Sequence, residues 1–263
     1  MITFASLVPH PPLLIPEIGR EHFALLEATV RAYQHLADEL YASQPGTVFI
    51  ISPHATERDR NFTINQSPIL RTNFKDFGDL VTNLSFKNDL SLGYKIKESC
   101  ETSLPLTLVA NEVIDYGTAV PLYYLLKNLK ETKIVAASVS NLSRHDHVRF
   151  GQAVKEIVES SSERIAVIAS GDLSHRLHKD SPAGFSVRAQ EFDQNIRRLL
   201  QENKTAEIIN IDESLVREAG ECGYRSLLVL LGLIQDFNWQ SEELAYQSPF
   251  GIGYLTENII LHR

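Results

Sequence analysis

The sequence contains little cysteine, methionine or tryptophan: its 263 residues include two cysteines, one methionine and one tryptophan. Two cysteines, Cys100 and Cys222, are too few for a disulfide framework, and this usage is typical of a reducing compartment. No apolar run reaches the roughly 18 residues that a membrane-spanning helix needs. Residues 1–12 have no basic region before their apolar run, which argues against a signal peptide. We therefore expect a cytoplasmic protein without a membrane partner.

Positive charge is also scarce. Lys and Arg number 25 against 33 Asp and Glu, which gives a formal net charge of −8. The chain has no run of five or more Lys or Arg, whereas nucleic-acid-binding proteins typically carry a basic patch. We therefore expect no nucleic-acid partner. The apolar fraction of 43% is that of an ordinary folded globular chain.

Several well-known catalytic motifs are missing. The sequence has no Gly-x-Gly-x-x-Gly, no phosphate-binding loop, no His-Glu-x-x-His and no Cys-x-x-Cys. It also lacks the Gly-x-Ser-x-Gly turn of the α/β-hydrolases. These absences argue against the most common dinucleotide-binding, nucleotide-hydrolysing and zinc-protease sites.

Short apolar runs alternate with segments of helical periodicity, which predicts an α/β fold with a buried sheet between helices. Residues 57–87 are polar and irregular, with weak strand signals at 62–64 and 80–81, and we expect an excursion or a β-insertion there. We find no repeat, no linker and no break in composition, so we expect a single domain over residues 1–263. The predicted strands are 2–8, 47–52, 133–139, 164–169 and 253–261, and the predicted helices are 20–43, 88–102, 119–130, 145–160, 184–201 and 221–235.

Three of the nine histidines follow predicted strands. His10, His54 and His175 each stand where a buried strand ends, and the carboxyl ends of parallel strands are where α/β sheets bind ligands. One such histidine is usually structural, but three at equivalent positions indicate a shared site. Neutral imidazole suits iron, zinc, copper and nickel. We expect the remaining histidines on polar surfaces, namely His22, His35, His145, His147, His178 and His262.

The third metal ligand remains open from the residues alone. Two histidines and one carboxylate form the usual site of non-haem Fe(II) enzymes, and Glu221, at the start of an apolar segment, is the candidate carboxylate. Its alternative role is to stabilise the start of a helix. Cys222 is the rival, because a thiolate is a soft ligand suited to zinc or copper. Its alternative role is that of a small buried apolar residue.

Five short motifs occur in an order that resembles a known family. The chain is similar to the catalytic B subunit of class III, LigB-type extradiol ring-cleavage dioxygenases and to their relatives, the Memo-like proteins. The resemblance covers nearly the whole chain. The motifs are 8–12 (VPHPP), 52–54 (SPH), 115–122 (DYGTAVPL), 170–175 (SGDLSH) and 249–255 (PFGIGYL).

This resemblance implies a three-layer α/β/α domain, of a phosphorylase/hydrolase-like type, with a mixed, largely parallel sheet. It implies Fe(II), or zinc or another divalent metal, held by His10, His54 and Glu221, with His175 as the catalytic acid and base. In the Memo-like branch the ligand is a cysteine, which matches Cys222 here. The implied substrates are a catechol-like aromatic diol and O₂, and the implied assembly is a homo-oligomer or a complex with a small partner subunit.

Two residues depart from the family pattern. Tyr116 stands where many ring-cleaving members have histidine, and Asp172 stands where glycine is common. We expect Tyr116 to contact the substrate, although a phenol with an ordinary pKa of about 10 is a poor base at pH 7. We expect Asp115 and Asp172 to lie next to the ligands of the site. Asp172 would orient His175 or coordinate a cation, or its role would be only to cap the turn.

The sequence thus predicts an Fe(II)-dependent extradiol-type dioxygenase. The alternative is a Memo-like metal-binding protein that lacks ring cleavage and acts through a protein partner. A third hypothesis is a metal-dependent hydrolase on the same scaffold. A serine hydrolase is a separate alternative, because Ser170 and Ser174 place hydroxyls near His175 in the sequence, although the Gly-x-Ser-x-Gly turn is absent.

Overall fold

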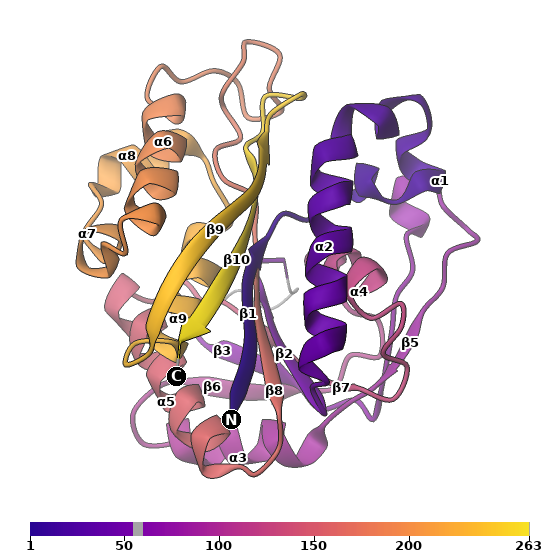
Figure 1. Cartoon of the computed structure of the whole chain (residues 1–263), viewed down its shortest axis with the longest axis vertical. Coiled ribbons are helices and arrows are strands. Elements are labelled where there is room, and N and C mark those ends of the chain that lie inside the picture. The colour runs from indigo at the N-terminus through magenta and orange to yellow at the C-terminus, as the bar shows by residue number, and fades with distance from the viewer. Residues whose placement is uncertain (55–59, 263) are drawn as a thin grey trace.

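The computed structural model describes residues 1–54 and 60–262. A mixed sheet of eight strands lies between two layers of helices (Figure 1). The order across the sheet is β6-β3-β7-β2-β8-β1-β10-β9. The predicted three-layer α/β/α fold is therefore confirmed. The strands are β1 (Ile2–Val8), β2 (Thr47–Ser52), β3 (Phe62–Asn65), β6 (Leu106–Val109), β7 (Lys133–Ser138), β8 (Ile165–Ser170), β9 (Asn238–Gln247) and β10 (Tyr254–His262).

The helices divide into two groups. One apolar core lies between the sheet and α3, α5, α6 and α9, and a second core lies between the other face and α2 and α4. No helix in the described part of the chain is long and apolar enough to cross a membrane. The helices are α1 (Pro16–Gly19), α2 (Glu27–Ser43), α3 (Leu90–Cys100), α4 (Tyr116–Leu125), α5 (Arg144–Ser160), α6 (Ala189–Gln201), α7 (Thr205–Ile209), α8 (Glu213–Ala219) and α9 (Tyr224–Leu233).

The strand signal at residues 62–64 is confirmed as part of β3, the signal at 80–81 is wrong, and one further strand had no prediction. The expected insertion supplies β3 to the main sheet, and its remainder forms a two-stranded sheet of β4 (Ile69–Arg71) and β5 (Ser85–Lys87). Residues 57–59 of that prediction lie outside the described residues. Strand β9 had no prediction, because it is an edge strand with mostly polar residues and few buried side chains.

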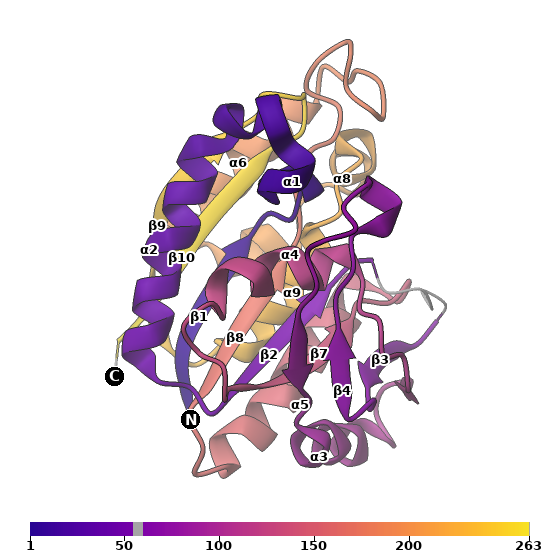
Figure 2. The same ribbon diagram turned by 90° about the vertical axis from the view of Figure 1, so that its right-hand side faces the viewer.

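The centre of the sheet brings distant parts of the chain to one edge. Strands β1, β8, β2 and β7 are parallel neighbours and follow one another across Figure 2. Val8 at the end of β1 pairs with Ser170 at the end of β8, and Ile51 of β2 pairs with Ala169. The loops that follow these three strands therefore begin side by side.

The loop after β8 packs tightly against the start of α9. A Cβ atom on Gly171 would lie 2.1 Å from the Cα atom of Gly223, so only glycine allows this approach. The loop after β8 and the segment before α9 therefore share the same edge as the loops after β1 and β2.

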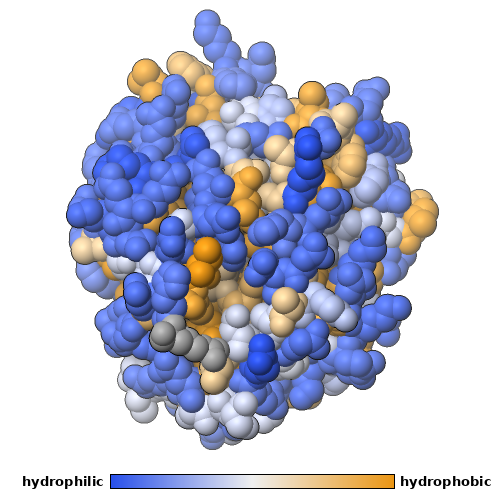
Figure 3. Space-filling view, in the orientation of Figure 1, coloured by the Kyte–Doolittle hydropathy of each residue, from blue (hydrophilic) through white to orange (hydrophobic). Residues whose placement is uncertain are grey.

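The face in Figure 3 is mainly hydrophilic, with a narrow band of apolar residues over β9, β10 and β1. A groove of about 270 Å³ near the beginning of β1 is lined by Ile2, Phe4, Ile260 and Leu261 among others. This groove is formed by the first residues of β1, whereas His10 follows the end of that strand.

Candidate metal centre

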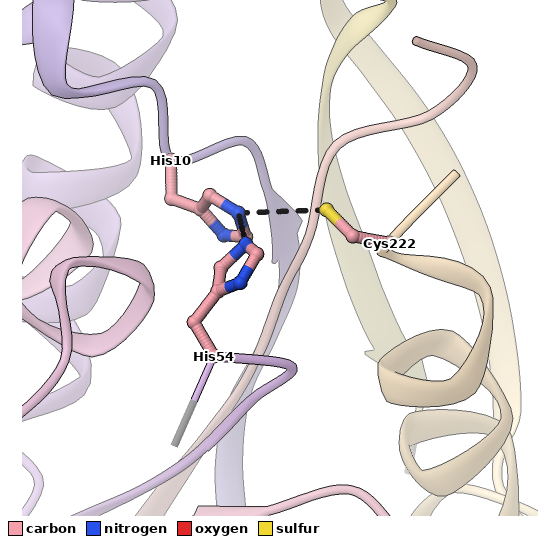
Figure 4. Close-up of side chains that lie close together, drawn as sticks. All are labelled: His10, His54 and Cys222. Carbon is pink, nitrogen blue, oxygen red and sulfur yellow. Dashed lines mark hydrogen bonds between the residues drawn. The ribbon is translucent and has the colours of Figure 1, made fainter. Parts of the chain in front are cut away.

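Two imidazoles and one thiol converge at the carboxyl edge of the sheet (Figure 4). The Nε2 atoms of His10 and His54 lie 2.9 Å apart. The Sγ atom of Cys222 lies 3.5 Å from Nε2 of His10. The structure thus brings together two of the predicted ligands and the predicted alternative ligand.

These separations fit a single metal ion. Two nitrogen donors about 2.0–2.1 Å from a metal, subtending about 90–110°, lie about 2.8–3.4 Å apart. A nitrogen at that distance and a thiolate at about 2.3 Å lie about 3.1–3.6 Å apart. The observed 2.9 Å and 3.5 Å fall within these two ranges. Imidazole and thiolate together suit zinc, copper and iron.

Hydrogen bonding determines which nitrogen of His10 faces the site. The Oγ atom of Ser170 donates its only hydrogen to the carbonyl oxygen of Gly117. It lies 2.8 Å from Nδ1 of His10, so it must accept a hydrogen bond from that nitrogen. The proton of His10 therefore resides on Nδ1, and the Nε2 lone pair is available to a metal.

Tyr116, the first residue of α4, lies against His54. The two rings stack with centroids 4.4 Å apart, and the tyrosine Oη atom lies 3.0 Å from Nε2 of His54. The structure thus places Tyr116 beside His54, and its expected contact with a substrate stays a prediction. Its hydroxyl is the polar group that a molecule bound next to His54 would meet.

Asp115 caps helix α4 and is linked through Ser52 to the backbone of His54. Its carboxylate accepts hydrogen bonds from the backbone N–H and the hydroxyl of Thr118, which caps α4. It also accepts a hydrogen bond of 2.5 Å from Ser52 Oγ, which in turn accepts one from the backbone N–H of His54. Asp115 thereby connects the Tyr116 helix to the His54 loop. The sequence prediction missed Ser52, although it lies in one of the five motifs.

Asp172 connects His10 to Cys222. Its Oδ1 accepts a hydrogen bond of 2.9 Å from the backbone N–H of His10. Its own backbone N–H points to Cys222 Sγ at 3.3 Å, and its carbonyl oxygen accepts from Gly223 N–H. Burial raises the pKa of the Asp172 carboxyl to about 7.

His175 lies close to Cys222 and Asp172. Ligand atoms of Asp172, His175 and Cys222 lie within 4.8 Å of one another. The Nε2 atom of His175 is buried and has no hydrogen-bond partner among the described residues. Burial lowers the pKa of this imidazole below its usual range, so it is neutral at pH 7. A buried imidazole nitrogen without a partner is suited to exchange a proton with a bound molecule.

Glu221 lies outside this donor group. Its Oε2 accepts a hydrogen bond of 2.5 Å from the backbone N–H of Tyr224, at the start of α9. Helix α9 begins at Tyr224 rather than at the predicted residue 221, so Glu221 and Cys222 occupy the preceding turn. There the two side chains have different neighbours, and Cys222 is the one grouped with the histidines.

Two further expectations need correction. His147 is not a surface residue: it is fully buried, and its Nδ1 donates to the carbonyl oxygen of Ser143 at 2.8 Å. The serine-hydrolase hypothesis also loses its nucleophile. Ser170 Oγ donates to Gly117, and Ser174 Oγ donates to the carbonyl oxygen of Ala219.

Tyr116 also lines a pocket of about 370 Å³. Its walls come from β3, β6, β7, the start of α4 and the insertion between β4 and β5. Phe77, from the insertion, meets the Tyr116 ring edge-on with centroids 5.2 Å apart. Tyr116 is thus shared by this pocket, hereafter the Tyr116 pocket, and the metal-ligand group.

Comparisons with known proteins identify the family. A model described as the catalytic LigB subunit of aromatic ring-opening dioxygenase matches residues 4–256. Protein CA_C1420 of Clostridium acetobutylicum is 34% identical over 258 residues, covering 94% of this chain and 55% of that protein. A 3,4-dihydroxyphenylacetate 2,3-dioxygenase of Escherichia coli is 28% identical over 169 residues, covering 60% of this chain and 56% of that enzyme.

A solved structure shows the same fold. An uncharacterized protein of Escherichia coli K12 superposes with a TM-score of 0.71 and 17% identity, over 98% of this chain and 99% of that one. The chain spans about half the length of the two curated relatives. Because the family model matches almost the whole of this chain, the chain belongs to the family of catalytic LigB subunits of aromatic ring-opening dioxygenases.

Proposed function

We propose that this chain is a metal-dependent dioxygenase of the extradiol type, with an aromatic diol and O₂ as substrates. The observation that carries the proposal is the convergence of His10, His54 and Cys222 beside His175, whose buried Nε2 atom has no partner among the described residues. The named activity of the Escherichia coli relative is of this type.

In this proposal His10, His54 and Cys222 hold the metal, and Glu221 stabilises the start of α9 instead. Fe(II), when bound, would supply Lewis acidity toward the diol oxygens and the redox chemistry that O₂ requires. Zinc or another divalent metal is the alternative occupant of the same donor set. Ser170 and Asp172 hold His10 in one tautomer and position.

His175 is the proposed acid and base. Because its imidazole is neutral, Nε2 accepts a proton from a diol hydroxyl and later returns it to a product oxygen. Tyr116 Oη is the proposed hydrogen-bond donor to the substrate, because His54 Nε2, its present neighbour, would be turned to the metal. These roles assign proton transfer and orientation to separate side chains.

The test is turnover by the iron-loaded protein. After anaerobic loading with Fe(II), a panel of catechols is added with O₂, and oxygen uptake and absorbance are followed. We expect His175→Ala to keep the metal but lose turnover by about 100-fold or more. His178→Ala, which removes an exposed histidine of the same loop, is the matched control and should keep full turnover. Full iron occupancy without oxygen uptake on any diol would refute the proposal.

A second candidate is favoured by the donor set itself. A thiolate in place of a carboxylate, together with tyrosine at position 116, is the pattern of a Memo-like metal-binding protein without ring cleavage, acting through a protein partner. Metal analysis of the protein as isolated separates the two. Bound zinc or copper, with no diol turnover after exchange for iron, would support this second candidate.

We further propose that the chain works in the cytoplasm, as a homo-oligomer or with a small partner subunit. The support is the family membership and the absence of a membrane-crossing helix in the described ranges 1–54 and 60–262. Light scattering of the purified chain measures its oligomeric state. The same measurement on any complex that the chain forms in the cell tests for a small partner subunit.

A further inference from the structure

We infer that the Tyr116 pocket selects an aromatic ring with a positively charged amine tail and disfavours a carboxylate tail. The inference deepens the proposed function, since it names the substrate class of the same site. It rests on the charges, rings and amides that line the pocket.

The pocket has the size and polarity of a small-molecule site. Its volume of about 370 Å³ accommodates a single aromatic ring with a short tail. Its lining combines apolar side chains with the amides of Asn65, Asn73 and Asn111, so it can take an apolar ring and a polar tail together. The lining residues are Thr63, Asn65, Asn73, Asp76, Phe77, Val109, Asn111, Val113, Ile114, Asp115, Tyr116, Thr118, Ala136 and Ala137.

The charge in this lining has one sign. Among the described residues that line the pocket, the only charged side chains are Asp76 and Asp115. Asp115 is engaged by Ser52 and Thr118. Asp76 is exposed and has no ion pair or hydrogen bond among the described residues. It is therefore available to a cationic ligand, whereas a carboxylate would meet repulsion without a compensating described cation in the lining.

Two aromatic rings line the same pocket as this carboxylate. Phe77 follows Asp76 directly in the chain and contacts the Tyr116 ring at 5.2 Å, with the planes 76° apart. Ring faces attract ammonium groups, and a carboxylate beside aromatic rings is a common arrangement for binding them. The amides of Asn73 and Asn111 add neutral hydrogen-bonding groups. The net charge of −8 also favours a cationic ligand, because it draws cations toward the protein.

The experiment measures binding rather than turnover. Three monophenols share one ring and differ in the tail: tyramine carries an amine, 4-hydroxyphenylethanol a hydroxyl and 4-hydroxyphenylacetate a carboxylate. Their dissociation constants are measured by calorimetry on the zinc-loaded chain, because zinc has no redox chemistry and the phenol is common to all three. A failed ring-cleavage assay would therefore leave this measurement unaffected.

We expect tyramine to bind about three- to fivefold more tightly than the alcohol, and the carboxylate to bind more weakly than the alcohol by a similar factor. Asp76→Asn should bring tyramine to within about twofold of the alcohol, and Asp76→Lys should reverse the order of amine and carboxylate. Asp38→Asn is the matched control, because it removes the same charge from an exposed position on α2.

The inference is overturned if the carboxylate binds at least as tightly as the amine. It is also overturned if Asp76→Asn and Asp38→Asn have the same effect, since the preference would then come from the net charge alone. Absence of binding by all three compounds at millimolar concentration would exclude the pocket as a ligand site.

Discussion

The orientation of His10 depends on one hydroxyl group, which makes Ser170→Ala a sensitive test of the site. Ser170 is fully buried, and His10 is 1% exposed, so water cannot replace the lost acceptor. An unpaired buried N–H group costs about 1–3 kcal/mol. The metal-free imidazole can escape this penalty by moving its proton to Nε2, and that tautomer cannot bind the metal. We therefore expect metal affinity to fall by about 10- to 100-fold, as is usual when such a supporting group is removed.

The assay is competition for zinc against a chelator of known affinity. Ser6→Ala is the matched control: Ser6 is also fully buried, on the neighbouring strand β1, but its Oγ has no partner among the described residues. This variant should keep the native metal affinity. If the two variants bind zinc within about twofold of each other, then Ser170 does not set the tautomer of His10 and the reasoning fails.

Two further predictions concern the scaffold. Burial raises the pKa of Glu257 to about 7, so the folded state holds this proton more tightly than the unfolded state, where the pKa is about 4.3. The stabilisation is full below about pH 4 and is lost as the pH rises through about 7, so Glu257→Gln should stabilise the protein by about 1–3 kcal/mol at pH 8 and by nothing at pH 4. Urea unfolding at both pH values tests this, and an equal effect at both would contradict it. Gly171→Ala should cost more than about 2 kcal/mol and weaken metal binding, because its Cβ would lie 2.1 Å from Gly223 Cα. Gly46→Ala, with no non-neighbouring atom within 3.8 Å of its new Cβ, should leave metal binding unchanged.

Much of the fold was predictable, because the central strands are apolar along their whole length. Strands β1, β2, β7 and β8 were each expected within one residue of their observed bounds. The edge strand β9 was not, because few of its side chains are buried and its polar sequence does not differ from that of a loop. The helix predicted from residue 20 begins as a 3-10 helix, Arg20–Leu26, before α2.

The positions of His10, His54 and His175 were predictable for a different reason. Strand ends in a parallel sheet meet at one edge, so their spacing in the sequence is irrelevant. That Cys222 rather than Glu221 lies with the two histidines was not predictable, because it depends on where α9 starts and on which of two adjacent side chains accepts a hydrogen bond from its first N–H group. The burial of His147 was also not predictable from the sequence. Its imidazole is paired with backbone groups, the carbonyl oxygen of Ser143 and the N–H of Ser140, and any residue type supplies such groups.

The central claim is that His10, His54 and Cys222 hold one metal ion and that Glu221 does not. Titration of the metal-free chain with Co(II) measures this directly, since cobalt reports thiolate ligation by charge-transfer absorption. We predict one ion per chain with a thiolate band, loss of that band in Cys222→Ser, and native binding in Glu221→Gln and in Cys100→Ser, the other cysteine. Binding that survives Cys222→Ser but is lost in Glu221→Gln would contradict the account.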